Sequence, residues 1–114
     1  MSNEQVVSID TIRTLAEASI GATYSAIGPV FAEPVRLICF TNNTDGDMFF
    51  SDDGVNDKLF VAAGSFKLFD LQTNHLAKTQ YWVLPINTQL YVRYNTTPTK
   101  GAVYVECLWG QFDA

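Results

Sequence analysis

Short apolar segments separated by turn-forming clusters run through the sequence from residue 35 onward. The segments are rich in Val, Ile, Phe, Tyr and Trp, and the clusters between them are rich in Asn, Asp, Gly, Thr and Pro. This pattern is typical of β-strands joined by tight turns, because β-branched and aromatic side chains suit a pleated surface. The predicted strands cover residues 35–41, 47–51, 58–63, 65–71, 80–84, 88–94 and 102–109.

Several of these segments alternate with a period of two. In residues 88–94 the two alternating sets are Leu90, Val92 and Tyr94 on one side and Gln89, Tyr91 and Arg93 on the other. Such alternation indicates strands with one buried face and one wetter face, as in antiparallel sheets. We therefore predict an all-β fold, an antiparallel β-sandwich of about seven or eight strands, either immunoglobulin-like or jelly-roll-like.

The connections contain residues that favour turns for local reasons. The Asx-rich cluster 42–46 and the Asp-Asp-Gly cluster 52–54 each end in a glycine, which accepts a positive φ. Residues 85–87 and 96–101 include prolines, which remove a backbone donor where no strand pairing is needed. Each cluster is predicted as a turn.

The first 34 residues fit two patterns. Ser8 could cap a helix with Ile9, Ile12 and Leu15 on one side, yet residues 17–24 alternate as a strand does. We favour an extended arm. The predicted organisation is one domain, with an N-terminal arm and first strand in residues 1–34 and the sandwich core in residues 35–114. Such an arm could reach a neighbouring subunit.

Size and charge exclude several classes of function. A chain of 114 residues has one core and no room for a two-domain enzyme. The net charge is −5 and no Lys/Arg cluster occurs, so direct nucleic-acid binding is not expected. The beginning of the sequence lacks the features of a secretory signal, and the apolar stretches are much shorter than a membrane span. We expect a cytosolic protein that does not enter the membrane.

The two cysteines, Cys39 and Cys107, lie within apolar segments. A reducing compartment and burial favour free, unreactive thiols. A disulfide between them would need adjacent strands, and whether they pair stays open. The single histidine, His75, lies in a turn-like segment, so a Cys/His catalytic pair is conceivable but has no support.

Acidic residues concentrate in two neighbouring turns, at Asp45, Asp47, Asp52, Asp53 and Asp57. Carboxylates on irregular loops can bind Ca²⁺, but the spacing does not match an EF-hand. Turn chemistry explains the same residues without a metal, and we favour it. Glu106 is predicted to point outward from its strand. No catalytic motif is present, so we expect a non-enzymatic protein with no catalytic residues and no cofactor.

Aromatic residues are numerous: eight Phe, five Tyr and two Trp. Their positions place rings on both faces of several strands, so a small core cannot contain all of them. A two-sided core covered by the arm, a subunit interface and a sugar-binding platform are the three explanations. The interface candidates are Phe49, Phe50, Tyr81, Trp82, Tyr94 and Trp109.

The run FTNNTDGDMFFSDDGVNDKLFVAAGSFKLFDLQTN, followed by NTQLYVRY and TPTKGAVYVECLWG, resembles a group of small virion proteins of tailed bacteriophages. The similarity spans about residues 22–110 and consists of turn and strand signatures. The matching positions are Arg36, Asn42, Asn43, Thr44, Asp45, Ser51, Asp53, Gly54, Ala63, Gly64, Ser65, Phe66, Asp70, Tyr91, Val92, Pro98, Thr99, Gly101, Val103 and Tyr104. One departure is Asn87, where the pattern has Gly before Thr88.

The resemblance implies a β-sandwich protein present in many copies in a virus particle. We expect a structural component, either a capsid decoration or cement protein or a neck or tail accessory protein, that is assembled in the host cytoplasm. Its expected partners are copies of itself and other capsid, neck or tail proteins. The alternative is a carbohydrate-binding module that aids attachment to the host surface, with Trp82, Trp109 or Tyr94 as stacking platforms.

Overall fold

The computed structural model describes residues 5–71 and 84–112, with side chains described from Ser8 to Leu71 and from Leu84 to Trp109. Within these ranges the chain forms nine strands and one short 3-10 helix, η1. The elements are β1 (Gln5–Ile9), β2 (Arg13–Ala16), η1 (Glu17–Ser19), β3 (Ser25–Ala26), β4 (Val35–Thr44), β5 (Met48–Ser51), β6 (Leu59–Val61), β7 (Phe66–Asp70), β8 (Tyr91–Tyr94) and β9 (Gly101–Phe112).

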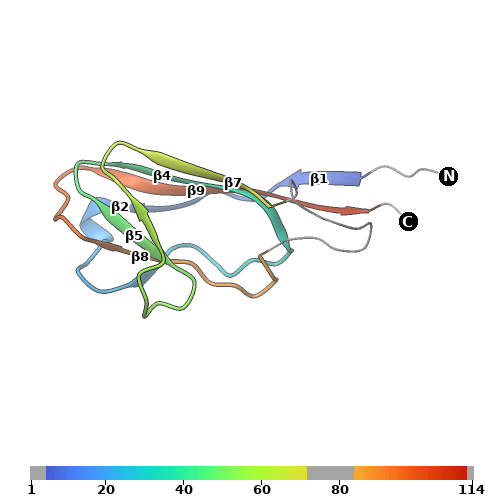
Figure 1. Cartoon of the computed structure of the whole chain (residues 1–114), viewed down its shortest axis with the longest axis horizontal. Helices are drawn as coiled ribbons and strands as arrows, with labels where there is room; N and C mark the ends of the chain where they lie inside the picture. Colours follow the sequence, from blue (N-terminus) through green and yellow to red (C-terminus); the bar gives the residue numbers. More distant parts are fainter. Residues whose placement is uncertain (1–4, 72–83, 113–114) are drawn as a thin grey trace.

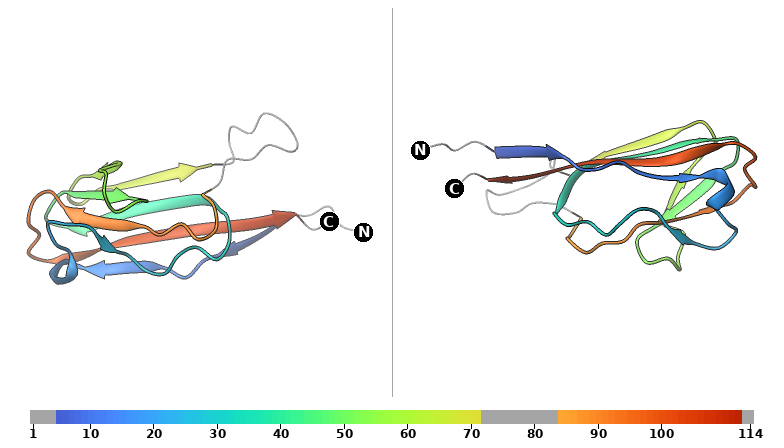
Figure 2. Two further views of the ribbon diagram at one scale, coloured as in Figure 1. Left: turned by 90° about the horizontal axis from the view of Figure 1, so that it is seen from below. Right: turned by 180° about the vertical axis from the view of Figure 1, so that it is seen from behind.

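Two antiparallel sheets pack face to face, which confirms the predicted β-sandwich (Figure 1). In the large sheet β1 and β2 both pair with β9, and β4 and β7 follow; the small sheet has the order β3-β8-β5-β6. The two layers are visible from two further directions in Figure 2.

The pairing of the strands distinguishes between the two predicted kinds of sandwich. β5 pairs with β6, β4 with β7, β3 with β8 and β2 with β9, so the pairs are nested like the two arms of one long hairpin. The hairpin is rolled so that β4 also pairs with β9 and β5 also pairs with β8. This arrangement is a jelly roll.

The described part of the first 34 residues, from Gln5 onward, is extended apart from η1 and belongs to both sheets. β1 and β2 pair with successive parts of β9, and β3 pairs with β8. The predicted arm is therefore extended, and its strands lie on the chain's own sheets. β1 and the last residues of β9 form a two-stranded ribbon that extends past the end of the sandwich (Figure 1).

β4 is longer than predicted, and the expected turn 42–46 is wrong in its first half. Asn42, Asn43 and Thr44 lie in β4 opposite residues of β9, and only Asp45 and Gly46 form the bend. The reason is the side chain of Asn42, which is completely buried. Its Nδ2 donates to the carbonyl oxygens of Gly46 at 2.8 Å and Val61 at 2.9 Å. Asn42 thus organises the turn from inside the strand.

Other predicted strands are shorter in the structure. β6 and β8 retain three and four residues of their predicted segments. Of the predicted strand 80–84 only Leu84 lies within the described residues, and it forms an isolated bridge with Val35. Asn87, the departure from the virion-protein pattern, has a φ of 67°. Next to Gly, Asn is the residue type that most readily adopts a positive φ, so the expected turn is retained.

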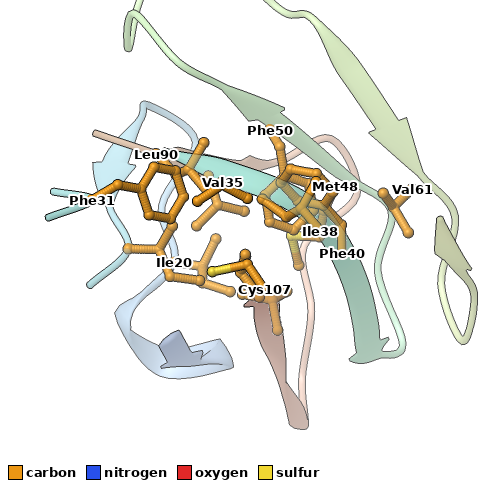
Figure 3. Close-up of a cluster of buried hydrophobic side chains, with 14 residues drawn as sticks. Ile20, Phe31, Val35, Ile38, Phe40, Met48, Phe50, Val61, Leu90 and Cys107 are labelled. Atoms are coloured by element: carbon orange, nitrogen blue, oxygen red, sulfur yellow. The ribbon is translucent and has the colours of Figure 1, made fainter. Parts of the chain in front are cut away.

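The core lies between the inner faces of the two sheets (Figure 3). β4 and β9 supply alternate residues from the large sheet, and Met48, Phe50 and Val92 supply the small sheet. The rings of Phe40 and Phe50 meet across the layers, with centroids 5.0 Å apart. The buried apolar residues are Ile20, Ile27, Phe31, Val35, Ile38, Phe40, Met48, Phe50, Val61, Leu90, Val92, Val103, Val105 and Cys107.

A buried arginine holds the connection between β3 and β4 against the large sheet. The guanidinium of Arg13 donates to Asp10 at 2.9 Å and to the carbonyl oxygen of Pro29 at 3.0 Å. It also lies 4.3 Å from the centre of the Phe31 ring. Gly28, with a φ of 68°, passes so close that a Cβ there would meet the Arg13 side chain at 2.4 Å. The charge of Arg13 is therefore compensated by a carboxylate, backbone carbonyls and a ring.

Candidate interaction surfaces

The edge strand β7 carries three exposed large apolar side chains within five residues. β7 pairs only with β4 among the described strands, and all five of its residues are exposed. Phe66 and Leu68 expose 66% and 55% of their surface and face outward, opposite Thr41 and Cys39 of β4. Phe69 faces the inner side and reaches the ring of Phe40. We call Phe66, Leu68 and Phe69 the β7 strip.

The outer face of the large sheet continues the β7 strip with further partly exposed side chains. On this face β4 carries Leu37 and β9 carries Tyr104 and Leu108, and all three side chains are half-buried. Ile9, on β1, is 82% exposed. Glu106 is exposed on the same face, opposite Cys39, as the sequence predicted. An edge strand with unpaired backbone beside exposed apolar groups is a typical site of protein association.

The outer face of the small sheet carries a second group of side chains from four segments. Phe49 of β5 stands opposite Arg93 of β8 on one side and Phe60 of β6 on the other. The Phe49 and Phe60 rings are 5.4 Å apart, and the Arg93 guanidinium lies 4.8 Å from the Phe49 ring. Tyr24, just before β3, brings its ring to 5.8 Å from the same guanidinium. We call these four residues the aromatic–arginine row.

Asp57, from the loop between β5 and β6, fixes one end of the aromatic–arginine row. It accepts hydrogen bonds from Nε of Arg93 at 2.8 Å, from the Arg93 terminal nitrogen at 2.5 Å and from the Tyr24 hydroxyl at 2.5 Å. These bonds from Arg93 and then Tyr24 lower the pKa of Asp57. Burial, followed by the hydrogen bond to Asp57, raises the pKa of Tyr24 to about 12. The row is thus preorganised, with the tyrosine neutral and the carboxylate ionised.

The interface candidates from the sequence have different locations. Phe49 lies in the aromatic–arginine row and is half-buried. Phe50 is only 1% exposed, so it belongs to the core and its assignment to an interface is wrong. Tyr94 packs against the core, and Trp109 is half-buried on β9 opposite Val35. Tyr81 and Trp82 lie outside the described residues.

The five clustered aspartates accept hydrogen bonds from protein donors or pair with a lysine. Asp45 accepts from the backbone amide and hydroxyl of Thr99, and Asp47 accepts from the amide of Ala63 at 3.0 Å. Asp52 pairs with Lys58 at 2.7 Å. These contacts join the turns to neighbouring loops.

Asp53 has the largest number of donors of the five. It accepts from the Ser51 hydroxyl at 2.7 Å and from the amides of Val55 and Asn56. These hydrogen bonds, chiefly the one from Ser51, hold the pKa of Asp53 far below its usual range. In the described part of the chain no three His, Cys, Asp or Glu side chains gather as a metal site would need. The geometry is that of Asx turns.

The two cysteines lie on adjacent strands but on opposite faces of the large sheet. Cys107 pairs in register with Ile38 and points into the core, whereas Cys39 pairs with Glu106 and points outward. Both are free thiols. Burial raises the pKa of the Cys107 thiol to about 11, which makes it a poor nucleophile. His75 lies outside the described residues.

The aromatic–arginine row was not found from the sequence because its members are separated by up to about 70 residues and form no local motif. The alternation of residues 88–94 did place Arg93 on the wetter face, which is a partial signal. Its partners Tyr24, Phe60 and Asp57 become neighbours only through the nested strand pairing.

No protein-family model matches the chain, and neither a curated protein nor a solved structure matches it. Among the residues that the structure describes, no helix is long and apolar enough to cross a membrane.

Proposed function

We propose that the chain is a non-enzymatic structural component of a tailed-phage virion, a capsid decoration or cement protein or a neck or tail accessory protein. It acts through protein–protein contacts with copies of itself and with neighbouring virion proteins. The observation that carries the proposal is the β7 strip, where Phe66 and Leu68 are more than half exposed on an edge strand. An exposed apolar edge strand can pair with another chain, so it favours association.

Two further observations support the proposal. The jelly roll occurs in viral capsid domains, although it also occurs in lectins and cupins, so this support is an analogy of fold. The turn and strand signatures that resemble small virion proteins include Phe66 and the strand that carries it. The β1–β9 ribbon, which extends past the sandwich, offers a second element for contacts between copies.

The test measures association and presence in the particle. We expect the purified chain to form oligomers in light scattering after gel filtration, and Phe66→Ser with Leu68→Ser to shift it toward the monomer. Val55→Ser is the control, since Val55 is an apolar side chain that is more exposed than Phe66 and Leu68 but lies in the β5–β6 loop. A compact monomer at high concentration, together with absence of its peptides from purified virions by mass spectrometry, would refute the proposal.

A carbohydrate-binding module is the second proposal, and the aromatic–arginine row favours it. Aromatic rings beside a fixed Arg–carboxylate pair can stack on sugar rings and donate hydrogen bonds to hydroxyl groups. Phe49 and Phe60 would be the platform in place of Tyr94, which packs against the core. A glycan array that gives signal with the parent chain and none with Phe60→Ala supports this function, and an array without signal contradicts it.

A further inference from the structure

An apolar pocket of about 230 Å³ opens between the two sheets, at the side where β7 and β6 form the sheet edges. The large sheet contributes Ile38, Phe40 and Phe69 to its wall, and the small sheet contributes Phe50 and Leu59. Leu71, Leu84 and Leu90 complete the apolar lining, and Ser51, Asp52 and Lys58 are the polar residues at its margin. Phe40 and Phe50, at the inner end, are labelled in Figure 3.

The wall of the pocket has almost no hydrogen-bonding capacity. The Ser51 hydroxyl donates to Asp53 at 2.7 Å and accepts from the amides of Asp53 and Gly54, so it is fully engaged. Water needs several polar partners to be stable in a cavity, whereas an apolar guest needs only the contact surface. The interior therefore selects a hydrocarbon group.

Among the described residues, two carboxylates lie beside one ammonium at the margin of the pocket, Asp52 as part of its lining and Asp53 just outside it. The Lys58 ammonium lies 2.7 Å from Asp52 and 3.6 Å from Asp53, so two carboxylates face one cation. The chain as a whole has a net charge of −5. An anionic head group beside Asp52 would meet the two carboxylates that already pair with Lys58, whereas a cationic head group would be attracted to them.

We propose that this pocket binds a small amphiphile with an apolar tail and a positively charged head group. A Leu/Ile/Phe-lined cavity of about 150 Å³ holds benzene, so by proportion this pocket holds a tail of roughly nine carbon atoms. The tail lies between Ile38, Phe69 and Leu59, and the head group lies beside Asp52. The proposal concerns the single chain and does not depend on the virion role.

The test is an amide NMR titration of the full-length chain with three probes of equal tail length: octylammonium, octanol and octanoate. We expect octylammonium to shift the signals of Ile38, Leu59 and Leu90. Octanoate should bind more weakly than octylammonium, by a factor of up to about five, because one surface charge contact contributes no more than that. Equal or tighter binding of octanoate overturns the proposal. Absence of binding by all three probes also overturns it, because the pocket is then filled by the chain itself.

Two pairs of variants locate the site. Leu59→Phe fills the pocket and should abolish binding, while Ile12→Phe, a matched enlargement of an exposed apolar side chain between β1 and β2, should leave it unchanged. Asp52→Asn should reduce the preference for octylammonium over octanol without affecting octanol, and Glu106→Gln, a matched loss of charge on the outer face, should not. Asp52 is on the surface, so this pair remains informative if Leu59→Phe fails to fold. Equal effects within either pair would mean unspecific adsorption and would refute the site.

Discussion

Asp57 accepts two hydrogen bonds from the guanidinium of Arg93, at 2.8 and 2.5 Å, although the two residues are 36 positions apart in the sequence. The nested pairing of the jelly roll creates this contact, because it places β8 beside β5 and the β5–β6 loop over the same face. A bidentate pair of this kind fixes the plane of the guanidinium. The rings of Phe49 and Tyr24 then lie on either side of a charge whose position is fixed.

The first prediction concerns the ionisation of Tyr24. Its pKa is raised to about 12 by burial and by the hydrogen bond and charge of Asp57. Asp57→Asn should lower the pKa of Tyr24, because the negative charge that opposes the tyrosinate disappears while Arg93 remains. NMR titration of the tyrosine ring signals measures the change, and Asp52→Asn is the control. Because the folded-state pKa exceeds the ordinary value of 10, stability falls as pH rises from about 10 to about 12. Titration of Tyr24 at its ordinary pKa in the parent chain would contradict the prediction.

The second prediction concerns the buried amide of Asn42. Asn42→Ala removes four hydrogen bonds and leaves the carbonyl oxygens of Gly46 and Val61 without this donor. An unsatisfied buried polar group costs about 1–3 kcal/mol, so we expect the free energy of unfolding to fall by about 3 kcal/mol. Urea denaturation measures it. The neighbouring Asn43 is exposed, and Asn43→Ala should change stability by less than about 0.5 kcal/mol. Similar effects of the two changes would show that the hydrogen bonds of Asn42 do not carry this stability.

Asn42 also shows where sequence reasoning succeeds and where it ends. The period-two segments predicted the sandwich, because alternation reports which face of a strand is buried. The Asx-rich cluster predicted a bend near residue 45, which is present. What the local pattern could not show is that Asn42 lies inside β4, because its acceptors Gly46 and Val61 are brought together by the pairing of β5 with β6.

The two candidate surfaces could also be predicted only in part from the sequence. The excess of aromatic residues correctly indicated that some rings lie outside the core, as Phe66 and Phe60 do. The alternation of a single strand cannot distinguish the inner from the outer face when both positions are aromatic, as at Phe49 and Phe50. The core position of Phe50 follows from its contact with Phe40 across the layers.

The third prediction compares two glycines with positive φ. Gly101 has a φ of 91°, and a Cβ there would lie 1.9 Å from the carbonyl oxygen of Asn43, whereas Gly64, with a φ of 72°, has open space around it. Gly64→Ala should cost about 1 kcal/mol, from backbone conformation alone. Gly101→Ala should cost about 3 kcal/mol or more, because β9 must also move away from β4. Thermal and urea unfolding measure both, and equal costs would contradict the close approach of the two strands.

The fourth prediction concerns stability in acid. The pKa values of Asp45, Asp53 and Asp57 are lowered in the folded chain, mainly by hydrogen bonds from Thr99, Ser51 and Arg93 respectively. A carboxyl group with a lowered folded-state pKa stabilises the fold above its ordinary pKa of 3.8, and this contribution is lost as pH falls below that value. We expect the urea concentration at the unfolding midpoint to be constant between pH 7 and about pH 5. It should decrease at pH values below about 4.

Asp53→Asn tests the origin of this acid dependence. An asparagine keeps an acceptor oxygen but cannot be ionised, so the variant should be less stable at pH 7 and its midpoint should depend less on pH below 4. Asp52→Asn is the control, since Asp52 contacts Lys58 and accepts none of the loop amides bound by Asp53. A parent midpoint that does not change between pH 5 and pH 2 would show that these hydrogen bonds do not stabilise the fold.

The fifth prediction concerns the reactivity of the two thiols. Cys39 points outward and is partly exposed, whereas Cys107 is buried beside Arg13 and Asp10 with its pKa raised to about 11, chiefly by burial. In the folded chain at pH 8 a disulfide reagent should modify Cys39 within minutes and Cys107 only at the rate of unfolding. Cys107→Ser should leave the fast reaction unchanged, and Cys39→Ser should abolish it. Denaturant should make both thiols reactive, and fast modification of Cys107 in the native chain would contradict its place in the core.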